Sequence, residues 1–399
     1  MRDMRVLYLT GFYPPPETAN GIRAFYFVRE LVNEGFDVVV VETVSRSNVD
    51  VGGFFGEKVV RIPLKSKGVI KRSFDILYKV LAVGKALSKL CMRYKPDIII
   101  ASWPSHDAML LGGRLSEELK IPLVVDVQDL SDYYSMMTDK YSVILRSLLY
   151  DKIYDIIDRA TNIATVTEPF KKLLELRVGR KDIFLIYNGV DVDLYKKELD
   201  NLNYRSKSVG GEIVGVFAGD LNWKYHMLDR FLIAIAIMMK KYRKRLRFEV
   251  IGSGRLLKYY EDVVKVLGID NVVTFVGYLE RGEFIRRLIL ADFGVIGRPN
   301  INNLWNIASV RTTLYEYMAA GLPIFAFGPP TSYIKHLIIK HKLGLYVSTD
   351  NPIILADELC NFLNNLDSFN RREIHEASYR YYWGTLSKEF ALIVKRSIK

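Results

Sequence analysis

The sequence predicts an α/β protein made of two doubly wound, parallel-sheet (Rossmann-like) domains that face each other across a cleft. Its 399 residues exceed the roughly 250–300 that a single hydrophobic core usually serves. Short apolar runs rich in β-branched residues alternate with segments of helical spacing, as in a parallel sheet with helices on both faces. A polar stretch at residues 196–211 interrupts the alternation, which then starts again.

The first half of the chain opens on a predicted strand. The stretch RVLYLT, residues 5–10, is a short apolar run that ends at Gly11. Residues 21–35 have helical spacing and end in a glycine, as helices commonly do. The alternation then predicts, in order, a strand at 37–43, a helix at about 71–93, a strand at 97–102, a helix at 107–119, a strand at 123–127, a helix at 141–158, and strands at 162–167 and 183–189.

The second half repeats the same logic. Strands are predicted at residues 212–219, 247–252, 272–277, 293–297 and 323–327, with helices between them. The final segment, about 371–398, is predicted to be one long helix with several aromatic residues. We therefore expect an N-terminal domain over residues 1–200 and a C-terminal domain over residues 201–370.

The cysteine content and the lengths of the apolar runs indicate the cellular compartment of the protein. The two cysteines, Cys91 and Cys360, lie far apart in helix-like surroundings, so neither a disulfide framework nor a cysteine metal site is expected. The longest apolar run, at residues 231–239, is far shorter than the ~20 residues that span a bilayer. The apolar run at the start is too short for a signal peptide. We expect a cytoplasmic protein.

The net charge of +12 indicates an anionic partner, although solubility alone would also explain it. Residues 61–95 contain ten basic residues and one acidic residue, with leucines and valines at helical spacing. A basic amphipathic helix is typical of membrane-surface binding, here at the inner face of the cell membrane. An ordinary helix with a core face and a lysine-rich solvent face remains open. Nucleic acid is not expected, because no nucleic-acid motif accompanies the charge.

Four stretches occur in order along the chain: VLYLTGFYPPP, YNGVDVDLY, GSGRLLKYY and LYEYMAAGLPIFA. In this order and spacing the chain resembles glycosyltransferase family 4 over nearly its whole length. The resemblance implies a retaining enzyme of the GT-B fold with a nucleotide-diphosphate sugar as co-substrate and no other cofactor. It also implies an acceptor site in the first domain, a donor site mostly in the second, and a C-terminal helix, about residues 371–399, that crosses back to the first domain.

The donor site is expected around Glu316. The resemblance places it where the family's glutamate accepts hydrogen bonds from the ribose hydroxyls, and a carboxylate is suited to accept from both donors of a cis-diol. Thr312 and Thr313 come in the first turn of the same predicted helix. Backbone N–H groups and hydroxyls at a helix start suit a diphosphate, and a threonine there is equally suited to cap the helix.

One departure from the family pattern concerns the donor sugar. The family often has a second glutamate eight residues before the first, and this chain has Ala308 there. Asn306, Ser309 and Arg311 lie nearby and are alternative contacts for the sugar.

A second departure concerns the charge that neutralises the diphosphate. Many relatives carry an arginine and a lysine after the first strand of the second domain, and Asp220 stands where the arginine usually is. Lys224 is the best substitute for the lysine, and Arg298 and Arg281 are further candidate cations. Tyr278 lies in the stretch that borders the base.

In the first domain, Asn20 and Gly21 are expected to present backbone N–H groups to the donor phosphate at a helix start. His106 follows a predicted strand and is a candidate to contact the transferred sugar or the acceptor. Asp126 and Asp129 follow the next strand and are candidates to orient the acceptor hydroxyl. Each of these three candidate catalytic residues has an alternative role as an ordinary loop residue or helix cap.

The resemblance implies front-face attack, in which the leaving diphosphate takes the acceptor proton and the oxocarbenium-like state is stabilised electrostatically. Cations and N–H donors at the phosphates are then needed, but neither a protein base nor a metal ion. The Asp191-x-Asp193 pair matches the family's NGVD stretch and is interpreted as structural.

The expected partners are a UDP- or GDP-sugar and a glycan acceptor, in particular a lipid-linked one. Two other functions remain open. One is an inactive or non-catalytic partner protein of the same fold, to which Ala308 and Asp220 point. The other is a sugar-nucleotide epimerase, for which we locate no set of catalytic carboxylates and histidines.

Overall fold

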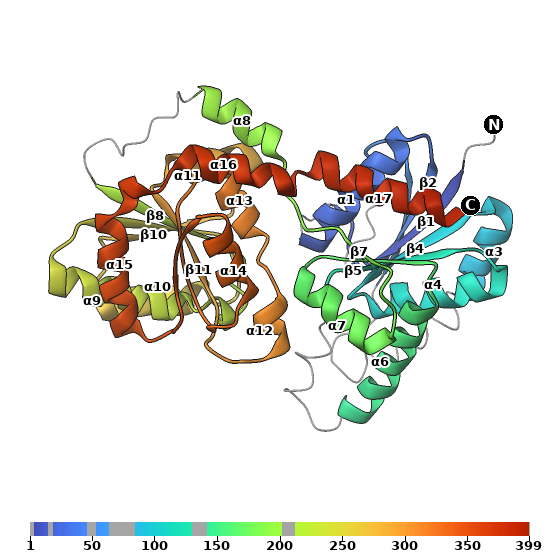
Figure 1. Ribbon diagram of the computed structural model, residues 1–399, viewed down its shortest axis with the longest axis horizontal. Coiled ribbons are helices and arrows are strands. Elements are labelled where there is room, and N and C mark those ends of the chain that lie inside the picture. The colour runs from blue at the N-terminus through green and yellow to red at the C-terminus, as the bar shows by residue number, and fades with distance from the viewer. Residues whose placement is uncertain are drawn as a thin grey trace. The chain divides into compact units, whose positions relative to one another are not determined.

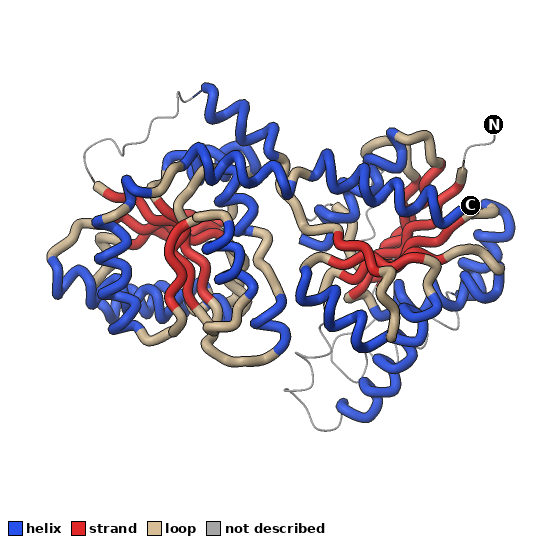
Figure 2. The backbone as a smooth tube through the Cα atoms, viewed as in Figure 1, coloured by secondary structure: helices blue, strands red, loops and turns tan. Residues whose placement is uncertain are grey.

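The computed structural model describes residues 4–14, 19–45, 53–63, 84–129, 142–201 and 212–398. The chain divides into two compact units, one formed by Met1–Asn188 with Trp383–Lys399 and the other by Gly189–Tyr382. Each unit contains a parallel sheet flanked by helices, as predicted (Figures 1 and 2). The division falls at residues 188–189, whereas the sequence led us to expect it near residue 200, and Trp383–Lys399 belongs to the first unit.

The described strands of the first unit form a seven-stranded sheet in the order β3-β2-β1-β4-β5-β6-β7. The strands are β1 (Arg5–Thr10), β2 (Asp37–Ser45), β3 (Lys58–Pro63), β4 (Ile98–Trp103), β5 (Leu123–Val127), β6 (Asn162–Thr165) and β7 (Ile183–Leu185). The helices are α1 (Ala19–Asn33), α3 (Gly84–Tyr94), α4 (His106–Leu119), α6 (Ser142–Arg159), α7 (Glu168–Val178) and α17 (Trp383–Ile398). The strand order reverses between β1 and β4, which makes the carboxyl ends of these strands the expected binding crevice.

The last helix of the chain is part of this unit's core. Phe390 of α17 stacks on Phe27 of α1 with ring centroids 3.9 Å apart, and Trp383 stacks on Tyr26 at 5.1 Å. Phe27 and Phe390 are fully buried, so α17 shields the apolar face of α1 from water.

The described strands of the second unit form a six-stranded parallel sheet in the order β10-β9-β8-β11-β12-β13. The strands are β8 (Ile213–Ala218), β9 (Leu246–Ile251), β10 (Val273–Gly277), β11 (Phe293–Gly297), β12 (Ile324–Phe327) and β13 (Gly344–Val347). The helices are α8 (Val192–Asn201), η2 (Lys224–His226), α9 (Leu228–Tyr242), α10 (Leu257–Leu267), α11 (Arg281–Leu290), α12 (Leu304–Ala308), α13 (Thr313–Ala319), α14 (Tyr333–Lys340), α15 (Pro352–Asn364), η3 (Leu366–Ser368), α16 (Arg371–Ser378) and η4 (Tyr379–Tyr381).

Helix α13 is fixed to the centre of this sheet by Tyr317. Its buried hydroxyl accepts a hydrogen bond of 2.9 Å from the backbone N–H of Ala218, the last residue of β8. Its ring lies against Gly294 of β11, where an added Cβ would come within 2.6 Å of a ring carbon. The glycine therefore allows the short helix to approach the sheet closely, and this sets the position of Glu316 on the same helix.

Several expectations about the elements need correction. The single helix expected at 371–398 is broken into α16, η4 and α17, with Tyr382 in an extended conformation between the last two. Residues 71–83 of the helix expected at 71–93 lie outside the described residues, and α3 begins at Gly84. The sequence analysis did not locate β3, β13, α7, α8, α14 or α15. Helix α8 occupies part of the stretch expected to be a polar gap, because its polar residues face solvent while Tyr195 and Leu199 are buried.

None of the described helices combines the length and the hydropathy that crossing a bilayer requires.

Candidate functional site

The strand order of the second unit reverses between β8 and β11, because β8 pairs with β9 on one side and with β11 on the other. In a doubly wound sheet, ligands bind beyond the carboxyl ends of the strands at this switch point. At this point Gly219 directly follows β8, and Arg298 directly follows β11.

Side chains from three further positions converge on this switch point. Arg311 and Thr313, at the start of α13, both donate to the backbone carbonyl of Ala218, at 3.2 Å from Nη2 and 3.3 Å from Oγ1. Arg298 donates from Nη2 to the hydroxyl of Ser309 at 3.1 Å. The structure thus brings together four residues that the sequence analysis named for the donor site, Arg298, Ser309, Arg311 and Thr313.

Aromatic rings enclose the charged groups of the switch point. The Arg298 guanidinium lies 4.6 Å from the ring centroid of Trp305 and 5.5 Å from that of Tyr225. The His226 ring is buried beside them, and its pKa is far below the usual value, first because of burial and then because of the Arg311 and Arg298 charges. His226 is therefore neutral, and the positive charge of the site resides on arginine.

Glu316 lies in the first turn of α13 and is engaged on both oxygens. Arg281, the first residue of α11, donates to Oε1 at 3.1 Å and to Oε2 at 2.9 Å. The hydroxyl of Tyr195, from α8, donates to Oε2 at 2.5 Å. Tyr195 is fully buried, and its pKa is well above the usual value because of burial and then the charge of Glu316. The side chain of Glu316 retains 18% exposure, so it is not fully buried by these partners.

The other predicted donor residues lie around this centre. Thr312 directly precedes α13, and its side chain makes no capping hydrogen bond. Lys224 lies over the Tyr259 ring, with Nζ 4.0 Å from the centroid, rather than within the arginine cluster. Tyr278 is 66% exposed in the loop before α11. Ala308 is buried at the end of α12, so the position of the family's second glutamate offers no polar group.

In the first unit, the predicted residues lie at the carboxyl ends of β4 and β5 and in α1. Gly21 lies in the first turn of α1, as does Asn20, whose side chain is outside the described residues. His106 is the first residue of α4, with its ring 4.9 Å from Trp103 and 5.6 Å from Tyr150 between centroids. Asp129 is partly exposed, two residues after β5.

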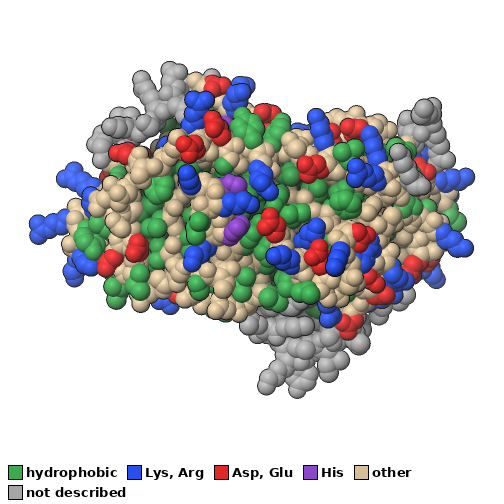
Figure 3. All heavy atoms as spheres, viewed as in Figure 1, with side chains coloured by type: hydrophobic (Ala, Val, Ile, Leu, Met, Phe, Trp, Pro, Cys, Tyr) green, Lys and Arg blue, Asp and Glu red, His purple; other side chains and the backbone are tan. Residues whose placement is uncertain are grey.

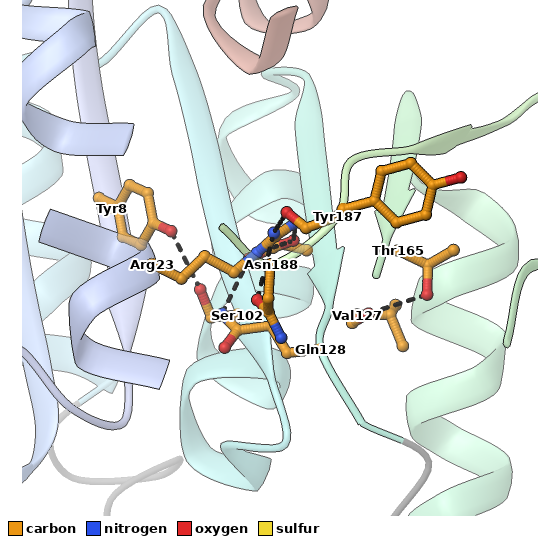
Figure 4. A network of polar contacts seen from close by, with 9 residues as sticks. Tyr8, Arg23, Ser102, Val127, Gln128, Thr165, Tyr187 and Asn188 are labelled. Atoms are coloured by element: carbon orange, nitrogen blue, oxygen red, sulfur yellow. Dashed lines mark hydrogen bonds and ion pairs between the residues drawn. The ribbon is translucent and has the colours of Figure 1, made fainter. Parts of the chain in front are cut away.

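Asp126 instead forms a fully buried ion pair with Arg23. Figure 4 shows the polar network around Arg23. Arg23 of α1 donates to Asp126 from Nη2 at 2.8 Å and from Nε at 2.9 Å, and Gln128 donates from Nε2 at 2.8 Å. Arg23 also donates from Nη1 to the backbone carbonyl of Tyr187 at 2.7 Å. Both carboxylate oxygens of Asp126 therefore face protein donors, which is the arrangement of a structural ion pair. The sequence analysis did not single out Arg23, although an arginine within the apolar run GIRAFYFV was a signal for it.

The basic segment at residues 61–95 is described only at its two ends, since residues 64–83 lie outside the described part. Arg61 forms an ion pair of 2.7 Å with Glu42, and both side chains are largely buried, so it is not a surface charge. In α3, Leu87 and Cys91 are buried while Lys85 and Lys89 are exposed. The described apolar face of this helix therefore packs within its own unit. On the face drawn in Figure 3, basic side chains are interspersed with acidic ones.

The residues interpreted as structural in the VDVD stretch include Asp193, which accepts a hydrogen bond from the hydroxyl of Tyr382. Across the described part of the chain, no group of three or more histidine, cysteine, aspartate or glutamate side chains is placed to hold a metal ion.

Two family profiles match the chain, one on each side of the polar stretch. Glycosyltransferase Family 4 matches residues 21–194, and Glycosyl transferases group 1 matches residues 212–365. The chain is a family 4-like glycosyltransferase. No curated protein matches its sequence.

Solved structures similar to this family 4-like glycosyltransferase extend over nearly the whole chain. HepE from Anabaena, in complex with UDP and glucose, has 15% identity and a TM-score of 0.70, covering 98% of this chain and 99% of that one. Sucrose-phosphate synthase from Thermosynechococcus elongatus has 14% identity and a TM-score of 0.77, with 98% of both chains covered. A proposed UDP-N-acetylglucosamine 2-epimerase from Listeria monocytogenes has 15% identity and a TM-score of 0.62, covering 99% of this chain and 96% of that one. At these identities the likeness establishes the GT-B fold.

Proposed function

We propose that this family 4-like glycosyltransferase transfers a sugar, with retention of configuration, from a UDP- or GDP-sugar to a glycan acceptor. The observation that supports the proposal most directly is the placement of Glu316. This partly exposed carboxylate lies on the helix that begins beside two arginines at the switch point of the second unit. In every nucleotide sugar the ribose diol lies next to the diphosphate. A carboxylate can accept hydrogen bonds from the diol, and neighbouring guanidinium groups can donate to the diphosphate.

The proposed chemistry is front-face transfer without a metal ion. As the bond between the sugar and the diphosphate breaks, negative charge develops on the leaving phosphate oxygens, and cations held in a dry site stabilise it most. Arg298, Thr312 and Thr313 are proposed to contact the diphosphate, with the backbone N–H of Gly21 as a further donor. The leaving diphosphate takes the acceptor proton, so no protein side chain has to act as the base.

On the acceptor side, we propose that His106 contacts the transferred sugar and that Asp129 orients the acceptor hydroxyl. Both follow the carboxyl end of a strand in the first unit. The Arg23 ion pair gives Asp126 a different role, that of holding α1 to the sheet.

A lipid-linked glycan is the proposed acceptor, reached from the cytoplasmic side of the membrane through the basic segment 61–95. The exposed Lys85 and Lys89 of α3 support this, since basic residues near an anionic leaflet each contribute about 1 kcal/mol of attraction. Flotation with liposomes that contain anionic lipid at low salt tests the idea. Protein that stays at the bottom of the gradient would contradict it.

A thermal-unfolding panel with UDP-, GDP- and ADP-sugars tests the donor proposal. A ligand at about 100 times its Kd stabilises the folded state by about 2.7 kcal/mol, so one nucleotide should raise the Tm measurably. The shift should disappear in Glu316→Ala and persist in Glu376→Ala, which removes an exposed carboxylate paired with Arg372. Absence of any shift in the wild-type protein would favour an inactive partner protein.

The epimerase alternative is supported by the similar Listeria fold. It predicts conversion of UDP-N-acetylglucosamine to its 2-epimer without an acceptor. Chromatography of the nucleotide sugar after incubation with the protein alone distinguishes this activity from transfer.

A further inference from the structure

The positive charge of Arg311 is not neutralised in the structure. The residue is 8% exposed, and it donates from Nη2 to the carbonyl of Ala218 at 3.2 Å. Among the residues that the structure describes, its buried Nη1 has no hydrogen-bond partner. Within the described part of the chain, no carboxylate forms an ion pair with it.

Such a group is expensive to bury. Removing an ion from water costs several kcal/mol (on the order of 5) even after relaxation, and a partner charge or further hydrogen bonds normally offset this. Burial lowers the pKa of Arg311 from its usual value, but a guanidinium stays protonated in proteins, so the charge cannot be relieved by loss of a proton. An anion bound to Arg311 would therefore reduce the unfavourable free energy of burying this charge.

The guanidinium of Arg311 lies directly beside Gly219. A Cβ added to this glycine would lie 2.2 Å from Nη2 of Arg311, so the guanidinium rests directly against the loop that leaves β8. Any side chain at this position would push the guanidinium away. The absence of a side chain at this glycine thus leaves room for the guanidinium at the carboxyl end of β8, where a doubly wound sheet binds its ligand.

Arg298 brings a second guanidinium to the same place. Arg298 is 3% exposed, and the buried His226 ring senses both charges, because Arg311 and Arg298 each contribute to the low pKa of this histidine. Two positive charges that share one neutral, aromatic-walled environment repel each other. A ligand with a single negative charge would offset only one of them, whereas a diphosphate carries enough charge and acceptor oxygens for both.

We propose that Arg311, with Arg298 beside it, is the cationic anchor for the diphosphate of the nucleotide donor. This inference rests on the proposed function and deepens it by naming the groups that hold the diphosphate. It also accounts for Asp220. The loop after β8 has an exposed carboxylate where a cation was expected, and the missing positive charge comes from Arg311, in the segment that leads into α13.

Isothermal titration with inorganic pyrophosphate tests the anchor, because this probe has neither base nor ribose and does not depend on Glu316. Wild-type protein should bind pyrophosphate, and Arg311→Gln should bind it at least tenfold more weakly. Arg372→Gln, which removes the same charge from a 79% exposed side chain in the same unit, should leave binding unchanged.

Asp220→Asn supplies a variant that does not disturb the buried cluster. Asp220 is exposed, and its charge opposes that of an incoming anion at the site. Its Oδ1 accepts a hydrogen bond of 2.7 Å from the backbone N–H of Asn222, and an asparagine oxygen can accept the same bond. Pyrophosphate should therefore bind this variant several-fold more tightly.

The outcomes separate this inference from the proposed function. Wild-type affinity in Arg311→Gln, or no gain in Asp220→Asn, would overturn the anchor. The anchor would also fall if pyrophosphate did not bind while a nucleotide sugar still raised the Tm, and the donor proposal would then stand. Pyrophosphate binding that depends on Arg311, without a response to any nucleotide sugar, would support the anion site and overturn the donor proposal.

Discussion

Arg281 donates two hydrogen bonds to the carboxylate of Glu316, one to each oxygen, at 3.1 and 2.9 Å. Tyr195 donates a third, at 2.5 Å. A carboxylate has about four acceptor positions, so these contacts leave room for about one more donor. A ribose diol brings two. Binding of a nucleoside at Glu316 therefore requires one of the present partners to leave, and Arg281, at 35% exposure, is better able to move than the fully buried Tyr195.

The first prediction is that Arg281→Ala binds the nucleotide several-fold more tightly, because the ribose no longer competes with the guanidinium for Glu316. Titration with the nucleotide that raises the Tm measures this. Arg286→Ala is the matched control, since it removes an exposed ion pair with Glu198 from the same helix. Weaker binding in Arg281→Ala would mean that this arginine contacts the nucleotide itself.

The second prediction concerns Tyr195. Its hydroxyl is the buried donor to Glu316, and a hydrogen bond to a charged group contributes about 1.5–3 kcal/mol. Tyr195→Phe should lower the free energy of unfolding in urea by about that amount. Tyr242→Phe removes an exposed hydrogen bond to Asp357 and should lower it by less than about 0.5 kcal/mol. Equal losses in the two variants would contradict a special role for Tyr195.

The third prediction is an alkaline loss of stability. Burial raises the pKa of Tyr317 to about 12, although Arg311 and two backbone hydrogen bonds oppose the rise. In the unfolded chain a tyrosine loses its proton near pH 10, so between about pH 10 and 12 the folded state binds more protons than the unfolded state. The free energy of unfolding should fall with rising pH there, by about 1.4 kcal/mol per pH unit for this group.

Urea unfolding of Tyr317→Phe at pH 9 to 11.5 checks this prediction. The slope of stability against pH should be shallower than in the wild type by the contribution of one tyrosine. Parallel slopes would show that Tyr317 does not carry the effect.

The fourth prediction separates Asp126 from Asp129. Removal of one partner of a buried ion pair costs about 3–5 kcal/mol, so Asp126→Ala should destabilise the protein by that amount. Asp129→Ala should change stability by less than about 1 kcal/mol and should lower the transfer rate if Asp129 orients the acceptor. A stable Asp126→Ala protein with a lost transfer rate would restore the catalytic role first predicted for Asp126.

The fifth prediction is that transfer does not need a divalent metal. The initial rate should be the same with and without excess chelator. Loss of activity with the chelator, restored by Mn²⁺, would contradict front-face transfer supported by arginine alone.

The buried strands could be predicted from the sequence. Short or polar segments could not, because their structure depends on tertiary packing. Strands such as β5 and β11 are short, mostly apolar runs, and their predicted limits agree with the structure. Helix α8 was missed because an exposed helix with few apolar residues has the composition of a linker. The final helix was predicted as continuous because no proline marks the break at Tyr382, and the nearby Gly384 lies inside α17.

The candidate site could likewise be predicted only in part. Glu316, Thr313 and Arg298 were predicted individually, from their positions after strands and from the resemblance. Arg281 and Arg311 were also named, as a candidate cation and a candidate sugar contact, and Tyr195 was not. The contacts that these three residues make depend on the folded arrangement, which no local pattern reveals. The role first given to Asp126 shows the limit most clearly. This residue lies within β5, and a carboxylate at the end of a strand looks the same in sequence whether it faces a ligand or a buried arginine.

The two units also differ in when they can be completed during synthesis. The second unit is one continuous segment, Gly189–Tyr382, and has all its residues before α17 is made. The first unit begins earlier but lacks α17, so the Phe27 face of α1 stays exposed until Phe390 has left the ribosome. The unit translated first is therefore finished last, and its uncovered apolar helix is the surface that a chaperone would meet in the growing chain.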